Sequence, residues 1–372
     1  MEQQLSLDFN LPNFLIQILD KIVAKGGIPI LVGGMVRDYF LKIKSKDYDI
    51  EIYQIESLEN LMCILREFGD VNVVGASFGI LKLNTNNMDI DFSFPRQESK
   101  SGIGHRGFNI KINSDLSYKS ASLRRDFTIN SIGYDFKNNK ILDPHNGIDD
   151  IKNKVLKYVN RNSFMEDPLR VYRAVQFCAR FNFILDTNTK QLCKDMVNYY
   201  EFNTLSKERI FQEYKKLLLK SKKPSIGISL LKKFNLNSYD NDTLKNIDDM
   251  VIFKSNNTKE NLVLMFYFIY EVLEKISEDK RLIKDIIRLK EFDIPKIYLY
   301  KIKNIKNKAE LISKKLDIMR NMPLPFVGGK ELISLGFKPS VEFKSILNRV
   351  YQLQLDGEIT SKNDAISYLN KI

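Results

Sequence analysis

The residues best suited to chemistry are acidic side chains set two apart in an apolar segment, residues 46–53. Alternate residues of a strand project to the same face, so Asp47, Asp49 and Glu51 would share one face. Neighbouring like charges repel and Asp is depleted in strands, so the pattern needs a counter-cation such as a hard divalent metal ion. A strand with a wet acidic face explains the segment alone equally well.

A second segment repeats the pattern, with Asp89, Asp91 and Ser93 alternating with apolar residues. If the two strands are neighbours, Asp91 can join Asp47 and Asp49 to hold two Mg²⁺ ions. That arrangement stabilises both the attacking and the leaving oxygen in phosphoryl or nucleotidyl transfer. In that case Asp47, Asp49 and Asp91 would be catalytic residues, with Asp47 and Asp49 as metal ligands and Mg²⁺ as the cofactor; two amphipathic strands with a wet acidic face are the alternative.

Two glycines, Gly33 and Gly34, follow a short apolar strand and precede a helix. Glycines in this position let backbone N–H groups approach phosphate oxygens at the positive end of the helix. A Gly-Gly pair alone more often marks a turn, but its place ahead of the acidic strand favours triphosphate binding by Gly33, Gly34 and Arg37. Arg37 could instead pair with an acid.

The elements that would position these residues alternate in type over the first third of the chain. Hydrophobic periodicity predicts helices near 14–24, 34–41 and 58–68, and strands at 28–32, 48–53, 71–74, 80–83 and 88–94. This order indicates an α/β domain. A strong turn signal at 143–147 is followed by helical periodicity.

Composition narrows the function. With 372 residues and 44% hydrophobic residues the chain should form two to three folded domains. The 58 Lys and Arg against 46 Asp and Glu give a net charge of +12, which favours nucleic acid as a partner and, less strongly, an anionic membrane surface. Basic residues crowd 207–233 and 296–320, as expected of an RNA-binding surface or of solvated helix faces.

Several classes of protein are excluded. The chain has two histidines, too few for an HExxH zinc protease or a histidine-cluster phosphohydrolase, so any metal should be held by oxygen. Its three cysteines form no CxxC pair and no disulfide framework. We find no apolar run of about 20 residues and no signal peptide, and expect a cytoplasmic protein.

Five ordered motifs together resemble the class II tRNA nucleotidyltransferase and bacterial poly(A) polymerase superfamily. They are Gly33-Gly34-x-Val36-Arg37-Asp38, Asp47-x-Asp49, Arg124-Arg125-Asp126-Phe127-Thr128-Ile129-Asn130, Asp143-Pro144 and Glu166-Asp167-Pro168-Leu169-Arg170-Val171-Tyr172-Arg173-Ala174. They span roughly residues 28 to 185, with a looser likeness near 208–210 and 329–332.

The resemblance implies an α/β N-terminal nucleotidyltransferase head of the polymerase-β-like type with a mixed sheet, followed by an all-α neck, body and tail. The corresponding domains would be the head at 1–137, the neck with the base-recognition helices at 138–205, the RNA-binding body at 206–322 and the RNA-binding tail at 323–372. It also implies a flexible loop at 95–117, which contains His105.

The resemblance places Arg125, Asp126 and Asn130 against the ribose. A surface ion pair for the Arg-Arg-Asp run and a turn hydrogen bond for Asn130 are the structural alternatives. Asp143 and Gly147 are interpreted as structural.

The segment 166–173 would choose the base, with Asp167 and Arg170 three apart on one helix face and Arg173 bracing the pair. A carboxylate that accepts from an amino group, beside a guanidinium that donates to a ring nitrogen, matches C and A but leaves U and G unmatched. An ordinary i,i+3 salt bridge is the alternative.

The implied activity is addition of C and A from CTP and ATP to the 3′ end of tRNA without a nucleic-acid template, with the acceptor and TΨC arms bound by the helical regions. Poly(A) polymerase activity is a second possibility, although the Gly-Arg-Arg-Phe-type signature of such enzymes is missing at residues 73–79. Addition of CC alone or A alone is also open. A non-catalytic RNA-binding protein on the same fold is the alternative from another class, and the oligomeric state is unknown.

Overall fold

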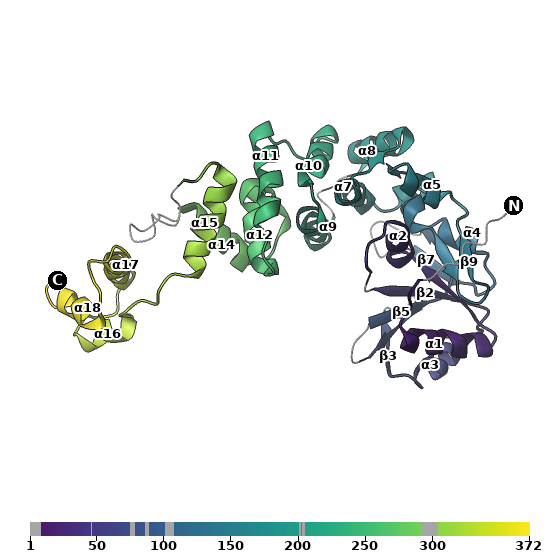
Figure 1. Ribbon diagram of the computed structural model, residues 1–372, viewed down its shortest axis with the longest axis horizontal. Coiled ribbons are helices and arrows are strands. Elements are labelled where there is room, and N and C mark those ends of the chain that lie inside the picture. The colour runs from purple at the N-terminus through teal and green to yellow at the C-terminus, as the bar shows by residue number, and fades with distance from the viewer. Residues whose placement is uncertain are drawn as a thin grey trace. The chain divides into compact units, whose positions relative to one another are not determined.

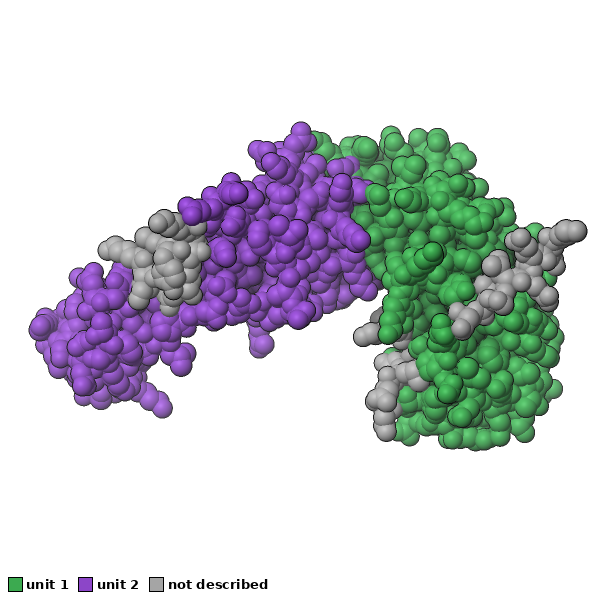
Figure 2. Space-filling view, viewed as in Figure 1, with its two compact units in different colours: residues 1–205, 230–237 green, residues 206–229, 238–372 purple. Residues whose placement is uncertain are grey.

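The computed structural model describes residues 9–45, 47–74, 79–85, 89–100, 108–200, 202, 205–291 and 304–372. The chain divides into two compact units, drawn in different colours in Figure 2. Unit 1 comprises Met1–Leu205 and Leu230–Asn237, and unit 2 comprises Ser206–Ser229 and Ser238–Ile372. The four-part division into head, neck, body and tail stays a prediction.

Unit 1 is built on a seven-stranded sheet in the order β3-β4-β5-β2-β1-β8-β9. The strands are β1 (Ile28–Val32), β2 (Tyr48–Tyr53), β3 (Asp70–Val74), β4 (Ile80–Asn84), β5 (Asp89–Ser93), β8 (Gly133–Asp135) and β9 (Lys140–Leu142). Strands β2 and β5 are parallel and the other neighbours are antiparallel. The predicted mixed sheet is confirmed.

Helices on one face of the sheet supply the core (Figure 1). Helix α1 (Asn13–Ala24) presents Leu15, Ile18 and Ile22, all fully buried, and packs on β1 and on α3 (Leu58–Leu65). The side chain of Ser57 caps α3 by accepting the N–H of Asn60. This apolar layer fixes the sheet behind the acidic strands.

Unit 1 also contains further described helices and a 3₁₀ turn. They are α2 (Gly34–Phe40), α4 (Tyr118–Ser122), the 3₁₀ turn η2 (Thr128–Asn130), α5 (Gly147–Lys152), α6 (Arg161–Met165), α7 (Leu169–Phe181) and α8 (Thr187–Tyr199). A small parallel pair, β10 (Val155–Leu156) and β11 (Ile184–Leu185), lies within residues 138–205, as does β9, so the neck expected to be all-α contains short strands.

Residues 95–117 were expected to form a flexible loop, but two parts of this segment form strands. Strands β6 (Arg96–Lys100) and β7 (Phe108–Ile112) form a two-stranded antiparallel ribbon. Ladder hydrogen bonds therefore hold both arms of the segment. Its middle, including His105, lies outside the described residues.

Every described element from Lys207 onward is a helix. They are α9 (Lys207–Lys220), α10 (Pro224–Lys233), α11 (Asn241–Met250), η4 (Val251–Phe253), α12 (Thr258–Phe266), η5 (Tyr267–Ile269), α13 (Tyr270–Ile276), α14 (Lys280–Glu291), α15 (Lys308–Arg320), α16 (Gly329–Ser334), α17 (Glu342–Leu355) and α18 (Lys362–Leu369). None of the described helices is long and apolar enough to cross a bilayer.

Candidate active site

The two acidic strands are neighbours. Asp49 on β2 lies directly opposite Asp91 on β5 in the parallel register. Asp47 precedes the first residue of β2 and is exposed. The backbone therefore brings the three predicted catalytic acids to one end of two adjoining strands.

The electrostatics of Asp49 reflect this crowding. Although Asp49 reaches solvent, the surrounding protein removes part of its hydration, and this desolvation raises its pKa. The carboxylates of Asp91, Asp47 and Glu51 raise that pKa further, against the lowering effect of Arg125. A cation between the strands would relieve this repulsion.

The donor set fits a divalent metal ion in its chemistry, since it is made of carboxylates and hard cations prefer oxygen. In the part of the chain that the structure describes, however, no three His, Cys, Asp or Glu side chains converge closely enough to form a metal cluster. Asp49 and Asp91 are in register, and Asp47 lies two residues before Asp49. Metal binding by these residues therefore stays a prediction.

Gly33 lies beside Asp49. Val32, the last residue of β1, pairs with Asp49, and Gly33 follows it with a φ of +73°, a conformation that favours glycine. A Cβ atom at Gly33 would lie 3.2 Å from the Asp49 Oδ2 atom and 3.6 Å from the Arg125 Nη1 atom. The turn predicted to bind triphosphate is thus adjacent to the acidic strands.

Glu51 is a site residue to which the sequence assigned no role. Its side chain is 1% exposed and accepts from Arg124 Nη2 at 2.5 Å, Arg125 Nη2 at 2.8 Å and the Tyr53 hydroxyl at 3.1 Å. Burial alone would raise the pKa of Glu51, but Arg125 and Arg124 outweigh it and leave the pKa lowered. Glu51 therefore holds Arg125 next to Asp49. The sequence pattern that could have identified Glu51 is its position on the same strand face as Asp47 and Asp49.

Arg37 is buried in a different set of contacts from the predicted one. Its Nε and Nη2 atoms donate to Asp38 Oδ1 at 2.8 and 2.7 Å, and Nη1 donates to Asn130 Oδ1 at 2.7 Å. Its guanidinium also lies 5.2 Å from the centre of the Phe177 ring. These contacts favour the acid-pairing alternative for Arg37 over phosphate binding.

The predicted ribose residues Asp126 and Asn130 are likewise buried and bonded within the protein. Asp126 Oδ1 accepts from the Phe127 and Asn130 amides, both at 2.8 Å, and Oδ2 accepts from Arg173 Nε at 2.7 Å and Nη2 at 2.6 Å. Burial raises the pKa of Asp126, but Arg173, Arg170 and the Asn130 hydrogen bond leave it lowered. The ion pair joins Asp126 to Arg173, so the structure brings a predicted ribose residue and a predicted base-recognition residue together.

The base-recognition segment is not one helix. Helix α7 begins at Leu169, so Asp167 lies before the helix. The helical conformation is disfavoured for Asp167 because a proline follows it. The Asp167 carboxylate accepts the N–H of Leu169 at 3.1 Å. Arg170 donates through Nη1 to the Ser163 carbonyl at 2.8 Å and through Nη2 to the Arg124 carbonyl at 2.7 Å. The expected arrangement of Asp167 and Arg170 on one helix face is corrected accordingly.

The structural interpretation of Asp143 and Gly147 agrees with the geometry. The Asp143 carboxylate accepts the N–H groups of Gly147 at 2.7 Å and Ile148 at 2.9 Å, at the start of α5. A Cβ at Gly147 would lie 2.2 Å from the Thr128 carbonyl oxygen, so no side chain fits there.

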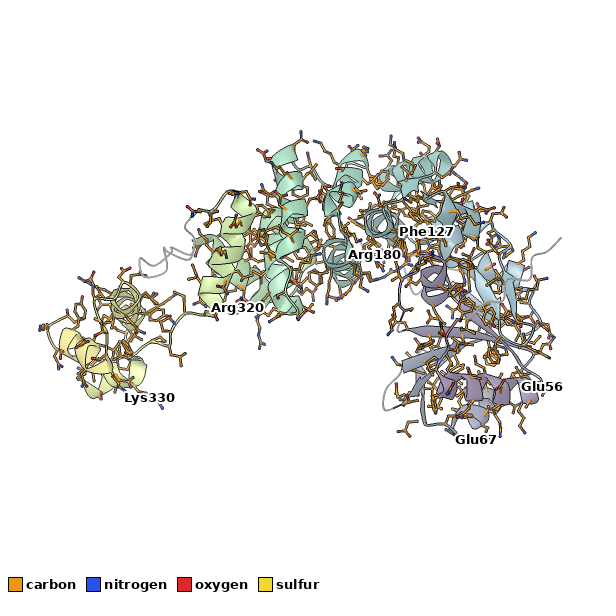
Figure 3. All side chains as sticks on the ribbon, viewed as in Figure 1. Glu56, Glu67, Phe127, Arg180, Arg320 and Lys330 are labelled. Atoms are coloured by element: carbon orange, nitrogen blue, oxygen red, sulfur yellow. The ribbon has the colours of Figure 1, made fainter. Side chains whose placement is uncertain are left out.

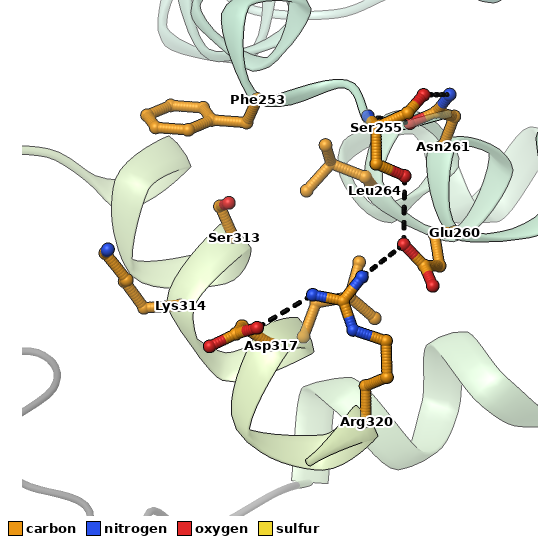
Figure 4. Close-up of a pocket in the computed structure, with 10 residues that line it drawn as sticks. Phe253, Ser255, Glu260, Asn261, Leu264, Ser313, Lys314, Asp317 and Arg320 are labelled. Carbon is orange, nitrogen blue, oxygen red and sulfur yellow. Dashed lines mark hydrogen bonds and ion pairs between the residues drawn. The ribbon is translucent and has the colours of Figure 1, made fainter. Parts of the chain in front are cut away.

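A separate hollow of about 300 Å³ lies in unit 2, between the 253–264 region and α15 (Figure 4). Arg320 donates there to Glu260 Oε2 at 2.5 Å and to Asp317 Oδ1 at 2.7 Å. Lys314 also lines the hollow, so two bases balance its two acids, and the hollow lacks the clustered negative charge found at the ends of β2 and β5.

Comparison with protein families identifies two segments. Residues 30–157 match the family described as "Poly A polymerase head domain", which includes both acidic strands and the glycine turn. Residues 182–239 match "Probable RNA and SrmB- binding site of polymerase A". The expected superfamily resemblance is confirmed for these segments.

Curated relatives carry a common name. The "Multifunctional CCA protein" of Aliivibrio salmonicida (strain LFI1238) is 38% identical over 205 residues, which is 54% of this chain and 48% of the relative. The protein of the same name from Shewanella frigidimarina (strain NCIMB 400) is 36% identical over 207 residues, or 54% of this chain and 47% of the relative. The chain therefore matches about half the length of these relatives.

Solved structures share the fold over nearly the whole chain. The Bacillus stearothermophilus CCA-adding enzyme in complex with CTP has a TM-score of 0.69 at 19% identity and covers 96% of each chain. The Thermotoga maritima CCA-adding enzyme complexed with tRNA has a TM-score of 0.63 at 20% identity, covering 98% of this chain and 96% of its own. The expected head followed by helices is confirmed as the fold.

Proposed function

We propose that this chain, which carries a poly A polymerase head domain at residues 30–157, is a tRNA nucleotidyltransferase that adds C and A to the tRNA 3′ end. CTP and ATP would be the donors, and no nucleic-acid template would be used. The observation that carries the proposal is the register of Asp49 with Asp91 beside the Gly33 turn. The names of the curated relatives support the choice of substrates.

The reaction is a displacement at the α-phosphorus. The 3′-oxygen of the tRNA forms a bond to that phosphorus, the bond from the α-phosphorus to the oxygen that bridges it to the β-phosphate breaks, and pyrophosphate leaves. The hydroxyl proton passes to water. Asp47, Asp49 and Asp91 would hold Mg²⁺. When bound, the metal would lower the pKa of the attacking hydroxyl and stabilise charge on the leaving group.

The residues around the acids would orient the nucleotide. The Gly33–Gly34 turn would offer backbone N–H groups to the phosphates; Gly33 is buried beside Asp49 and Arg125, and Gly34 is partly exposed. Arg125, held by Glu51, supplies positive charge beside Asp49, where the ribose and phosphates of the nucleotide would meet. This charge favours an anionic ligand at an otherwise acidic strand end.

The base would be read at the start of α7. The Asp167 carboxylate can accept from the amino group of C or A, and Arg170 can donate to the ring nitrogen. Hydrogen bonds to Ser163 and Arg124 fix the Arg170 guanidinium. Because U and G would leave these groups unmatched, the site would reject them.

The RNA would be held largely through its phosphates. The net charge of +12 and the lysines of α9 and α10 suit contacts with the acceptor and TΨC arms that do not depend on sequence. The matched RNA-binding segment at 182–239 supports this. A cytoplasmic location follows as a further prediction.

The test is nucleotide addition by the purified protein. With Mg²⁺ and tRNA lacking CCA, CA or A, we expect C, C and A to be added in order and synthesis to stop. A long A ladder would instead indicate poly(A) polymerase, and C or A alone a partial enzyme. RNA binding without incorporation, equal in wild type and Asp49→Asn, would indicate a non-catalytic RNA-binding protein.

A further inference from the structure

A buried chain of hydrogen bonds runs through unit 1 from α2 to α7. Asp38 pairs with Arg37, Arg37 donates to Asn130, Asn130 donates to Asp126, and Asp126 pairs with Arg173. Each of these links measures between 2.6 and 2.8 Å. The chain is continuous across three separate elements.

Asn130 is the central link because an amide offers both an acceptor and a donor. Its Oδ1 atom accepts from Arg37 Nη1, and its Nδ2 atom donates to Asp126 Oδ1. A carboxylate at this position could accept from Arg37 but could not donate to Asp126. A hydrocarbon side chain could do neither, and would leave buried polar groups unpaired.

The burial of the chain makes the connection stiff. Arg37, Asp38, Asn130 and Asp126 are between 6% and 9% exposed, whereas the Arg173 side chain is 30% exposed. Few waters can therefore replace a bond lost among the first four residues. Phe177 packs within the same region, with Arg37 and Arg173 at 5.2 and 5.3 Å from its ring centre (Phe127 and Arg180, which also contact this ring, are labelled in Figure 3).

The two ends of the chain lie next to the two ends of the proposed nucleotide site. Helix α2 begins at Gly34, directly after the Gly33 turn beside Asp49. Arg173 lies one turn after Arg170 on α7. A shift of α7 relative to α2 would therefore change the distance between the phosphates and the base-reading groups.

We propose that Asn130 is a positioning residue that locks the base-reading helix α7 to the phosphate-binding turn. The inference rests on the proposed function and assigns to Asn130 a role in base selection instead of ribose contact. This chain of hydrogen bonds sets where Arg170 lies relative to the acids. Weakening it should therefore reduce the discrimination between CTP and UTP.

The decisive experiment is a swap of the two central groups. Asn130→Asp alone places two carboxylates against each other, whereas Asn130→Asp combined with Asp126→Asn restores one carboxylate and one amide in reversed order. Arg37 would then donate to the acid at 130, and the amide at 126 would donate to that acid and accept from Arg173. The Phe127 N–H, which donates to Asp126 Oδ1 in the wild type, would lose its acceptor, so the swap restores the network only in part. The swap also restores the net charge.

The readout is the ratio of kcat/KM for CTP to that for UTP on tRNA lacking CCA, with thermal unfolding measured in parallel. We expect Asn130→Asp to lower the ratio by about tenfold or more, and the swap to recover part of it. Ser131→Ala is the matched control, since it removes a buried hydroxyl bonded to the Thr128 carbonyl at 2.7 Å outside the chain. It should keep the wild-type ratio.

The outcomes separate the proposals. An unchanged ratio in Asn130→Asp, no recovery in the swap, or an equal loss in Ser131→Ala would overturn the role of Asn130 while leaving the transferase intact. Wild-type protein that transfers no nucleotide would overturn both. If Asn130→Asp does not fold, Asn130→Ser, which is too short to make both bonds, provides the same comparison.

Discussion

Arg170 donates a hydrogen bond from Nη2 to the carbonyl oxygen of Arg124, 2.7 Å away. The side chain proposed to read the base is thus bonded to the residue whose own guanidinium pairs with Glu51, on the same strand as Asp49. A second nitrogen of Arg170 bonds to Ser163. The orientation of Arg170 therefore depends on two fixed carbonyl acceptors.

Replacing Arg170 by lysine should weaken base selection. A single ammonium group cannot reproduce the fork that reaches both carbonyls and a base. We expect kcat/KM for CTP to fall by about 10- to 100-fold, with a smaller loss for UTP. Single-turnover incorporation assays measure both.

Arg180→Lys is the control for this change. Arg180 lies on the same helix and stacks over Phe177 and Phe181, at 5.7 and 5.0 Å from their ring centres. We expect this variant to retain the wild-type preference for CTP over UTP. Equal losses in the two variants would argue that α7 is merely destabilised.

The acid Asp126 should make stability depend on pH. Its pKa is lowered in the fold, so the unfolded chain binds more protons in acid, and the stability it contributes is present above the unfolded value of about 3.9. That contribution is lost as the pH falls through the folded pKa. Urea unfolding should show Asp126→Asn less stable than wild type by about 1–3 kcal/mol at pH 7, with the gap closing below about pH 4.

Asp150→Asn should show the opposite trend. Burial raises the pKa of Asp150, so the folded protein binds more protons than the unfolded chain as the pH falls. The stability of wild type relative to Asp150→Asn should therefore increase with acid. If both variants followed the same pH trend, the protonation of these two acids would not be its source.

Asp49 and Asp91, which face each other across β2 and β5, should lower stability and be required for activity. Like charges directly opposite across two strands destabilise a sheet. We expect Asp49→Asn and Asp91→Asn each to raise the free energy of unfolding by about 0.2–1 kcal/mol. Activity should fall by about 10³-fold or more, since the proposed metal site is lost.

Asp70→Asn provides the comparison for these variants. Asp70 is exposed on the edge strand β3 and pairs with Asn84. Neither activity nor stability should change measurably. A loss of stability in Asp49→Asn or Asp91→Asn would contradict the view that these acids are held together at a cost.

The sequence predicted the two acidic strands because strand periodicity is local and carries the pattern of Asp49 and Asp91. That the two strands are neighbours was a condition of the prediction, and the structure supplies the pairing. It did not predict the partners of Arg37 and Asp126, which lie 93 and 47 residues away along the chain. Pairing over such distances depends on packing, which periodicity does not encode. The start of α7 follows from Pro168, which disfavours a helical conformation at Asp167.

Gly33 offers a final test of the geometry at the acidic strands. Gly33→Ala would force a side chain into a positive-φ conformation, at a cost of about 1–2 kcal/mol. It would also place a methyl group 3.2 Å from Asp49 Oδ2, so Asp49 must shift. We therefore expect both a lower melting temperature and a loss of nucleotide incorporation.

Gly336→Ala separates the two effects. Gly336 has a φ of +90°, and no atom lies within 4 Å of the position that a methyl group would take, so the substitution strains the backbone without displacing a neighbour. It should lower stability by a similar amount and leave incorporation near wild type at a temperature where both variants are folded. If Gly33→Ala kept full activity under those conditions, the turn could not lie against the reacting phosphates as proposed.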